Sequence, residues 1–166
     1  MRYYNAGLQS KKAFSLIELL VVIGIIAVLT AIAVPNYFKY LAKAKQVEVA
    51  ANLTALYTAE QIYFSENGEY STNLNGEGGL NWQPAGYQEG KDKNFYYTYG
   101  FNSDGQENMT YFVGKAKAPK EALSQTFANK SGFVAAAVCD LLGKGVYDIW
   151  TVDENKNIKH LQDGLK

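Results

Sequence analysis

The chain has 166 residues, and its 16 basic and 16 acidic side chains give a formal net charge of zero. Without a basic excess it is not typical of a dedicated nucleic-acid-binding protein, which normally presents a basic face. Cys139 is the only cysteine, which excludes an intramolecular disulfide, and the sequence contains neither zinc-ligand spacing nor a glycine-rich phosphate loop.

The first feature along the chain is an apolar run at residues 13–35, AFSLIELLVVIGIIAVLTAIAVP. It reaches the roughly 20 residues that span a bilayer, whereas a cleavable secretory signal has a shorter apolar core and a small-residue cleavage site. We therefore predict a membrane anchor. The run carries one charge, Glu18; a carboxylate at a bilayer centre costs about 2.5–3.5 kcal/mol, and intramembrane acids are functional by default. Three cations lie on each side of the run, so charge alone does not decide its orientation.

A single helix is predicted over residues 14–65, because no glycine or proline occurs from Asn36 until Gly68. At 1.5 Å per residue it would be roughly 78 Å long. Residues 14–35 form the membrane part, and Pro35 removes a helical hydrogen bond and predicts a kink. Beyond it, Tyr37, Phe38 and Tyr40 are typical of an aromatic belt at a membrane interface.

The second half of the predicted helix is amphipathic, with apolar residues at the 3–4 spacing of one buried stripe. The expected stripe is Val49, Leu53, Leu56, Ala59 and Tyr63, and the expected residues of the other faces are Lys45, Gln46, Glu48, Asn52, Thr58 and Gln61. The pair Asn67-Gly68 predicts the end of the helix.

Residues 66–94 are predicted to form a long connecting loop, because this stretch contains six glycines and Pro84 without a clear period. Such loops are commonly functional surfaces. Trp82 within it is expected to pack against the helix or the sheet rather than bind a ligand.

Residues 95–166 predict an antiparallel sheet, since β-branched and aromatic runs alternate with turn residues. The expected strands are 95–101, 109–118, 133–139, 146–152 and 157–161, the first two joined by a turn at residues 102–105. We expect a meander of four or five strands with one apolar face, which the amphipathic helix covers. The fold class is therefore α+β.

The N-terminal residues resemble those of type IV prepilins and the related secretion pseudopilins. The resemblance lies in the stretch KKAFSLIELL at residues 11–20, the long apolar run and Pro35, and it covers about the first 50 residues. It implies a basic leader at residues 1–13 that a prepilin peptidase removes by cutting between Ala13 and Phe14. It also implies N-methylation of Phe14. Glu18, four residues after Phe14, and Pro35, seventeen after Glu18, match the spacing of the family.

Two features depart from the family pattern. Ala13 stands where the family nearly always has glycine, although alanine is the next smallest residue. A cut after Gly7 would leave two lysines ahead of the apolar run and would spoil every other spacing. Many type IV pilins also close their C-terminal region with a disulfide, which Cys139 alone cannot form, so strand pairing or packing must hold this region.

The resemblance implies a structural subunit, not an enzyme, that polymerises into a helical filament through its N-terminal helix. Glu18 would neutralise the Phe14 amine of a neighbouring subunit, and Gly24 and Pro35 would flank a segment that loosens on assembly. The implied partners are other copies, a prepilin peptidase and an ATP-driven inner-membrane platform, with no small-molecule substrate. The chain would begin in a bacterial inner membrane, with a cytoplasmic N-terminus and a periplasmic head, and end in an extracellular pilus.

Several alternatives remain open. A secretion pseudopilin shares the fold, and a single-span protein that presents a periplasmic binding domain is an alternative of another class. Adhesion, motility, DNA uptake and electron transfer are not distinguished, nor is a major from a minor subunit.

Weaker signals concern metal and catalytic sites. Asp153, Asn155 and Asn157 alternate as in the opening of a calcium loop, but a hairpin turn explains them better because the glycine and the distal glutamate are missing. Cys139 and His160 lie on different predicted strands with no supporting motif, so they do not predict a catalytic pair. No cofactor is expected.

Overall fold

The computed structural model describes residues 14–91 and 93–165. A single helix, α1, occupies Leu16–Asn67, so it begins and ends two residues later than predicted. Gly68 follows it with a φ of 73°, and its N–H donates to the carbonyl of Phe64 at 2.8 Å. This left-handed glycine ends the helix, as predicted. Pro35 lies inside α1, which continues past it.

The contacts of the chain divide it into two units, one ending at Phe38 and one running from Lys39 to the C-terminus, here called the stalk unit and the head unit. Every described residue of the stalk unit is exposed, with Leu16 at 81% and Ile26 at 55%. The first buried residue of α1 is Ala42, in the head unit. Burial within the chain therefore begins only with the head unit.

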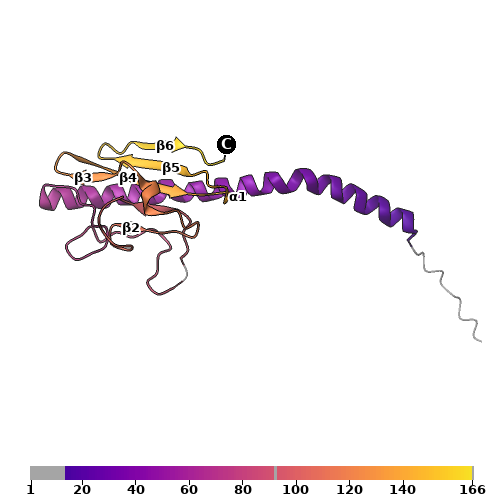
Figure 1. Cartoon of the computed structure of the whole chain (residues 1–166), viewed down its shortest axis with the longest axis horizontal. Helices are drawn as coiled ribbons and strands as arrows, with labels where there is room; N and C mark the ends of the chain where they lie inside the picture. The colour runs from indigo at the N-terminus through magenta and orange to yellow at the C-terminus, as the bar shows by residue number, and fades with distance from the viewer. Residues whose placement is uncertain (1–13, 92, 166) are drawn as a thin grey trace, which may run out of the picture. The chain divides into compact units, whose positions relative to one another are not determined.

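The head unit contains a six-stranded antiparallel sheet that lies beside the C-terminal part of α1 (Figure 1). The strand order is β2-β1-β4-β5-β6, and β3 pairs with the start of β4. An α+β fold with a long helix on an antiparallel sheet is therefore confirmed. The strands are β1 (Thr98–Gly100), β2 (Tyr111–Phe112), β3 (Phe127–Asn129), β4 (Gly132–Cys139), β5 (Asp148–Asp153) and β6 (Ile158–Gln162).

The sheet differs from the predicted meander in its order and in the length of its first strands. β1 pairs with β4 as well as with β2, with Thr98 opposite Val138, so one edge of the central strand is shared by β1 and β3. The predicted strand 109–118 shrinks to the two residues of β2, because it lies between two turns. Before it, the N–H groups of Met109 and Thr110 donate to the carbonyl of Gln106, and after it, the Lys117 N–H donates to the carbonyl of Gly114. β3 was not predicted, since its three residues carry too little periodicity to be distinguished from a loop.

The core lies between α1 and one face of the sheet, where Val49, Leu53 and Leu56 are fully buried. β4 alternates as a pleated strand must: Ala135 and Ala137 face this core, while Ala136 and Val138 face a second cluster. The short helix η1 (Lys120–Leu123) supplies Leu123 to that second cluster. The expectation of a single apolar face was therefore wrong, since the central strand is covered on both. The aromatic residues of the main core are Phe95, Tyr97, Tyr99, Phe101, Phe112 and Phe133.

The buried face of α1 is broader and more polar than the predicted stripe. Glu60 is fully buried, whereas Ala59 and Tyr63 are only partly buried. Asn52 was expected on a solvent-facing side of the helix but is 3% exposed, and its Nδ2 donates to the Tyr99 hydroxyl at 3.1 Å. The prediction failed at these positions because hydrogen-bonding partners from the sheet and loop make burial of a polar side chain tolerable.

The connecting loop after α1 contributes to the core as well as to the surface. Leu74 is fully buried, and Trp82 is 6% exposed and contacts the rings of Tyr99 and Phe112 edge-on. The packing role predicted for Trp82 is confirmed. Asn52 Oδ1 accepts a hydrogen bond from the backbone of Ala85 at 2.8 Å, which ties this loop to α1.

Candidate functional site

The N-terminal end of α1 carries the residues that the sequence singled out. Ala13, on one side of the predicted cut, lies outside the described residues, and Phe14 is 79% exposed. Ser15 Oγ accepts a hydrogen bond from the Glu18 N–H at 3.2 Å, directly ahead of the first helical residue, Leu16. Ser15 is thus the N-cap of α1, and Ser15 and Glu18 have the spacing of a capping box. A serine and a glutamate at these positions stabilise the start of the helix.

Glu18 lies in the first turn of α1 and is exposed. Its carboxylate interacts favourably with the positive end of the helix dipole. Within residues 14–91 and 93–165 its side chain makes no hydrogen bond or ion pair. The carboxylate is therefore available to a cation that the isolated chain does not supply from these residues.

Gly24 and Pro35 lie within the uninterrupted helix of the stalk unit. A Cβ added to Gly24 would meet nothing within 4 Å, so no contact inside the chain requires glycine there. Two side chains donate to helical carbonyls on this stretch, Thr30 to Ile26 at 2.7 Å and Asn36 to Ile32 at 3.2 Å. Loosening of this segment on assembly stays a prediction.

A polar cluster around the buried carboxylate of Asp148, the first residue of β5, was not predicted from the sequence. The Asp148 carboxylate is 0% exposed, and it binds Tyr97 Oη at 2.6 Å, Trp150 Nε1 at 2.7 Å and His160 Nε2 at 2.8 Å. The Trp150 and His160 rings also stack, with centroids 3.9 Å apart. Two further donors, the Gln46 side chain and the Gly164 N–H, complete the set, each at 3.0 Å.

This Asp148 cluster joins α1, the approach to β1, β5, β6 and the C-terminal segment at one carboxylate. Burial raises the pKa of the Asp148 carboxyl, but the hydrogen bonds from Tyr97, Gly164 and His160 outweigh burial and hold the pKa below its usual value. The cluster ties down the C-terminal region, for which the sequence offers no disulfide. No sequence signal marked it, because its members are scattered from residue 46 to residue 164.

Two groups of residues have donor atoms suited to a metal ion. Asp148, His160 and Asp163 each offer a ligand atom, and these atoms lie within 4.8 Å of one another. Both oxygens of Asp148 already accept hydrogen bonds, so the group is better suited to structure than to metal binding. In the β5–β6 turn, Asp153 accepts from the backbone N–H groups of Asn155 at 3.0 Å and Asn157 at 2.9 Å. These bonds form a tight turn, and calcium binding there stays a prediction.

Of the remaining reactive groups, Cys139 and Glu60 are buried, whereas His160 is exposed. Burial raises the pKa of the Cys139 thiol to about 12, so the thiolate is scarce at neutral pH. His160 is held by Asp148 and Trp150. Glu60 accepts one bond, from the Ser71 N–H at 3.1 Å, and its other oxygen is buried without a partner among the described residues. Burial raises the pKa of Glu60 to about 8, so this carboxyl is mostly protonated at neutral pH.

Comparison with known proteins concerns the same N-terminal segment. Residues 8–34 match the prokaryotic N-terminal methylation motif, which contains Ala13, Phe14 and Glu18. The chain is 50% identical over 64 residues to the type IV major pilin protein PilA of Myxococcus xanthus, covering 39% of this chain and 29% of that protein. It is 38% identical to the prepilin peptidase-dependent protein D of Escherichia coli over 44% of this chain and 50% of that protein.

The N-terminal part of the chain is thus similar to type IV pilins and secretion pseudopilins. The chain is also 34% identical to the type II secretion system core protein G of Klebsiella michiganensis, over 46% of this chain and 54% of that protein. Each of these matches spans about half or less of the relative's length. The family consists of structural subunits rather than enzymes. By length and composition, α1 is long and apolar enough to cross a membrane.

Proposed function

We propose that the chain is the structural subunit of a type IV pilus filament and polymerises through the stalk part of α1. The observation that carries the proposal is the methylation motif at residues 8–34, which overlaps the stalk part of α1, where every described apolar side chain is exposed. The similarity to a type IV major pilin supports a pilus role.

The apolar surface of the stalk unit requires either lipid or protein around it. Each Å² of apolar surface removed from water stabilises by about 25 cal/mol, so exposure of this helix in water is strongly unfavourable. Before assembly, the lipid of a bilayer covers this apolar surface. Outside the membrane, a bundle of identical helices removes the same surface from water, which makes a second copy the natural partner.

Processing supplies the missing partner of Glu18. A prepilin peptidase that cuts between Ala13 and Phe14 creates a new amine, which N-methylation keeps positively charged at neutral pH. In an apolar bundle a lone carboxylate is costly, and an ion pair with the Phe14 amine of a neighbouring copy removes this penalty and sets the axial register. A prepilin peptidase and an ATP-driven inner-membrane platform are the required partners, and the head would face the periplasm before export.

Two other functions remain to be distinguished. A secretion pseudopilin is supported by the similarity to the type II secretion core protein G. Such a subunit would make a short periplasmic fibre rather than a surface pilus. A single-span protein with a periplasmic binding domain would keep its apolar helix in the membrane and would not need Glu18.

Mass spectrometry of fibres sheared from intact cells tests the proposal. We expect this chain in the fibres with a mature N-terminus at N-methylated Phe14. A chain that retains residues 1–13 and stays in the inner membrane contradicts the proposal, and processed chains confined to the periplasmic fraction favour the pseudopilin.

Two substitutions of Glu18 separate its charge from its capping role. Glu18→Gln keeps the capping-box spacing but removes the charge, whereas Glu18→Ala removes both. We expect both variants to insert in the membrane and neither to form fibres. Normal fibres from Glu18→Gln, together with loss of fibres in Glu18→Ala, would show that capping rather than the ion pair matters. The exposed residue Glu69 provides the matched control, Glu69→Gln.

A further inference from the structure

A groove of about 410 Å³ runs beside the C-terminal end of α1 in the head unit. Its α1 side includes Ala55, Ala59, Ile62 and Glu66, and its opposite wall is formed by residues 79–81 of the connecting loop. Ile62 is 55% exposed. The alanines leave room for a side chain from outside, and the volume lies in the range of pockets that bind organic groups.

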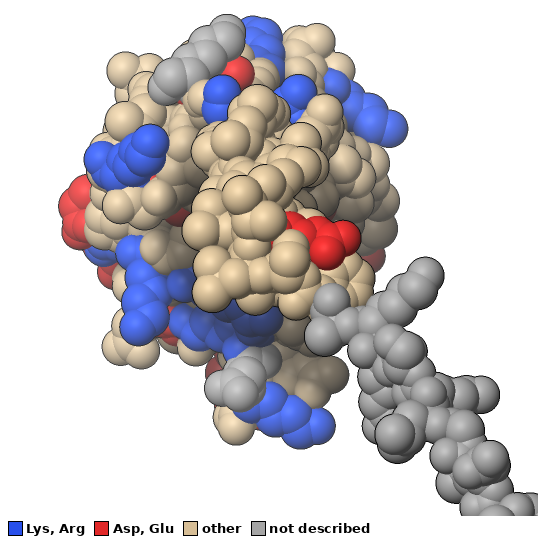
Figure 2. All heavy atoms as spheres, turned by 90° about the vertical axis from the view of Figure 1, so that its right-hand side faces the viewer, with Lys and Arg blue, Asp and Glu red and all other residues tan. Residues whose placement is uncertain are grey.

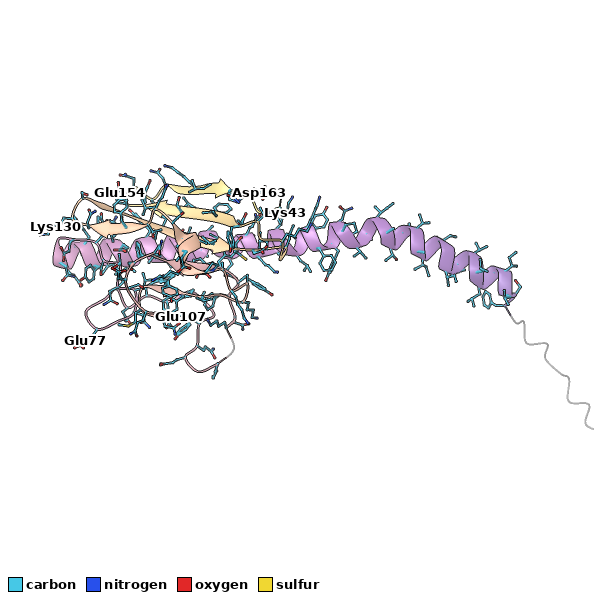
Figure 3. The ribbon with its side chains drawn as sticks, viewed as in Figure 1. Lys43, Glu77, Glu107, Lys130, Glu154 and Asp163 are labelled. Atoms are coloured by element: carbon cyan, nitrogen blue, oxygen red, sulfur yellow. The ribbon has the colours of Figure 1, made fainter. Side chains whose placement is uncertain are left out.

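The opposite end of the head unit carries an aromatic and basic pair on the same helix. Tyr40 is 71% exposed, and Lys43, three residues later, is also exposed. Residues three apart on a helix lie on one face, so the two side chains are presented together. Figure 3 places Lys43 at the end of the head unit opposite to Glu77 and Glu154, and in Figure 2 blue side chains outnumber red ones on the face viewed from the side of Lys43.

We propose that the groove of one copy receives Tyr40 and Lys43 of a second copy of this chain, with Tyr40 against Ile62 and Lys43 beside Glu66. This inference rests on the proposed filament, which brings parallel copies together. The spacing supports it, because Tyr40 to Lys43 and Ile62 to Glu66 are each one helical turn and lie in the same order along α1. A shift of 22 residues between two parallel helices brings Tyr40 level with Ile62, and one of 23 residues brings Lys43 level with Glu66, so a shift of about 33–35 Å suits both pairs.

The charges of the two surfaces are complementary and unsatisfied within the chain. Neither Lys43 nor Glu66 makes a hydrogen bond or ion pair among the described residues. Tyrosine is enriched at protein interfaces, where its ring fills an apolar site and its hydroxyl stays near water. Before assembly Tyr40 and Lys43 suit the membrane interface, and assembly transfers them from lipid to the groove of a neighbour.

Disulfide trapping in fibres tests the contact directly. In a Cys139→Ala background, which removes the one native cysteine, Tyr40→Cys is combined with Ile62→Cys and the fibres are oxidised. We expect a ladder of covalent multimers on a non-reducing gel, because each copy carries both partners of the contact. The matched control combines Tyr40→Cys with Val47→Cys, which is 74% exposed in the wild type and lies outside the groove, and we expect no ladder. Fibres of the Tyr40→Cys/Ile62→Cys chain without a ladder overturn the inference.

A charge exchange covers the case in which the paired cysteines prevent fibres from forming. Glu66→Lys places like charges together and is expected to lower the fibre yield about tenfold, and adding Lys43→Glu is expected to restore it. Glu69→Lys, an exposed acid outside the groove, is the control and should change little. Equal yields from Glu66→Lys and Glu69→Lys, or no recovery in the double variant, refute the contact. Absence of fibres from the unmodified chain contradicts the proposed function instead.

Discussion

The two parts of α1 are one continuous helix, yet they are stabilised in different ways. Up to Phe38 every described side chain is exposed, whereas from Ala42 onward a buried stripe packs on the sheet. The C-terminal part finds its apolar partners within the chain. The N-terminal part has none there, so its stability in any setting depends on lipid or on other copies. This difference separates the folding of the head from the assembly of the proposed filament.

The acids of the chain show the same contrast. Glu18, in the stalk unit, is exposed, whereas Asp148 and Glu60, in the head unit, are fully buried. Five donors surround Asp148 and lower its pKa, but one donor serves Glu60, and burial raises its pKa to about 8. The number of hydrogen bonds thus decides whether a buried carboxyl is charged.

The largest effect on the head unit is expected from Asp148→Ala. It leaves the buried Tyr97 hydroxyl and other donors unsatisfied and should cost about 4 kcal/mol of unfolding free energy. Urea unfolding of the detergent-solubilised chain, followed by tryptophan fluorescence, measures it, with the exposed Asp104→Ala as control. Because the folded pKa of Asp148 lies below the unfolded value, the stabilisation is present above the unfolded pKa and is lost as the pH falls through the folded pKa. If Asp148→Ala lowers the unfolding free energy by less than about 1 kcal/mol, a structural role for the cluster is contradicted.

A matched pair of leucines tests the contrast between the two parts of α1. Leu53 is fully buried and Leu29 is 62% exposed. Leu53→Ala should destabilise the solubilised monomer by about 3 kcal/mol, because it leaves a cavity in the core, whereas Leu29→Ala should leave its unfolding unchanged. In fibres we expect Leu29→Ala to weaken assembly. Equal effects of the two substitutions on the monomer would show that the contrast is wrong.

Glu60→Gln should change how stability depends on pH. The folded pKa of about 8 lies above the ordinary 4.5, so the unfolded chain releases its proton first and stability falls as the pH rises between these values. The unfolding free energy of the wild type should therefore fall by about 2 kcal/mol from about pH 5 to pH 7, and Glu60→Gln should abolish this fall. Unfolding midpoints of wild type and variant at both pH values provide the measurement. If the stability of the variant depends on pH as that of the wild type does, a group other than Glu60 is responsible for the dependence.

The smallest effect is expected from Gly24→Ala. Alanine favours a helix over glycine by about 1 kcal/mol, and nothing within the chain crowds the added methyl group. The helical content of the solubilised monomer should be unchanged or slightly higher. If Gly24 is needed for loosening on assembly, fibre yield should fall although the monomer is intact. A fibre yield equal to the wild type would indicate that this glycine has no role in assembly.

The sequence predicted the parts of the structure that depend on local order. The long helix, its glycine stop, the packing of Trp82 and the central strands follow from periodicity and turn residues. The short elements were not predicted correctly: β3 has three residues and was missed, and β2 was predicted too long because turns lie on both sides of it. Asn52 was misplaced, and the burial of Glu60 was not predicted, because a polar side chain on a helix looks solvent-facing until its tertiary surroundings are known.

The N-terminal segment is a candidate site that the sequence alone could identify, because Phe14, Glu18 and Pro35 match the spacing of a known motif. The Asp148 cluster and the groove at Ile62 could be decided only by the tertiary structure. Both join residues far apart in the chain, so the free energy of each depends on which side chains folding places within hydrogen-bonding or van der Waals distance. Which residues are neighbours on a helix follows from their spacing in the sequence, whereas which residues are neighbours across a sheet or a loop follows from tertiary packing.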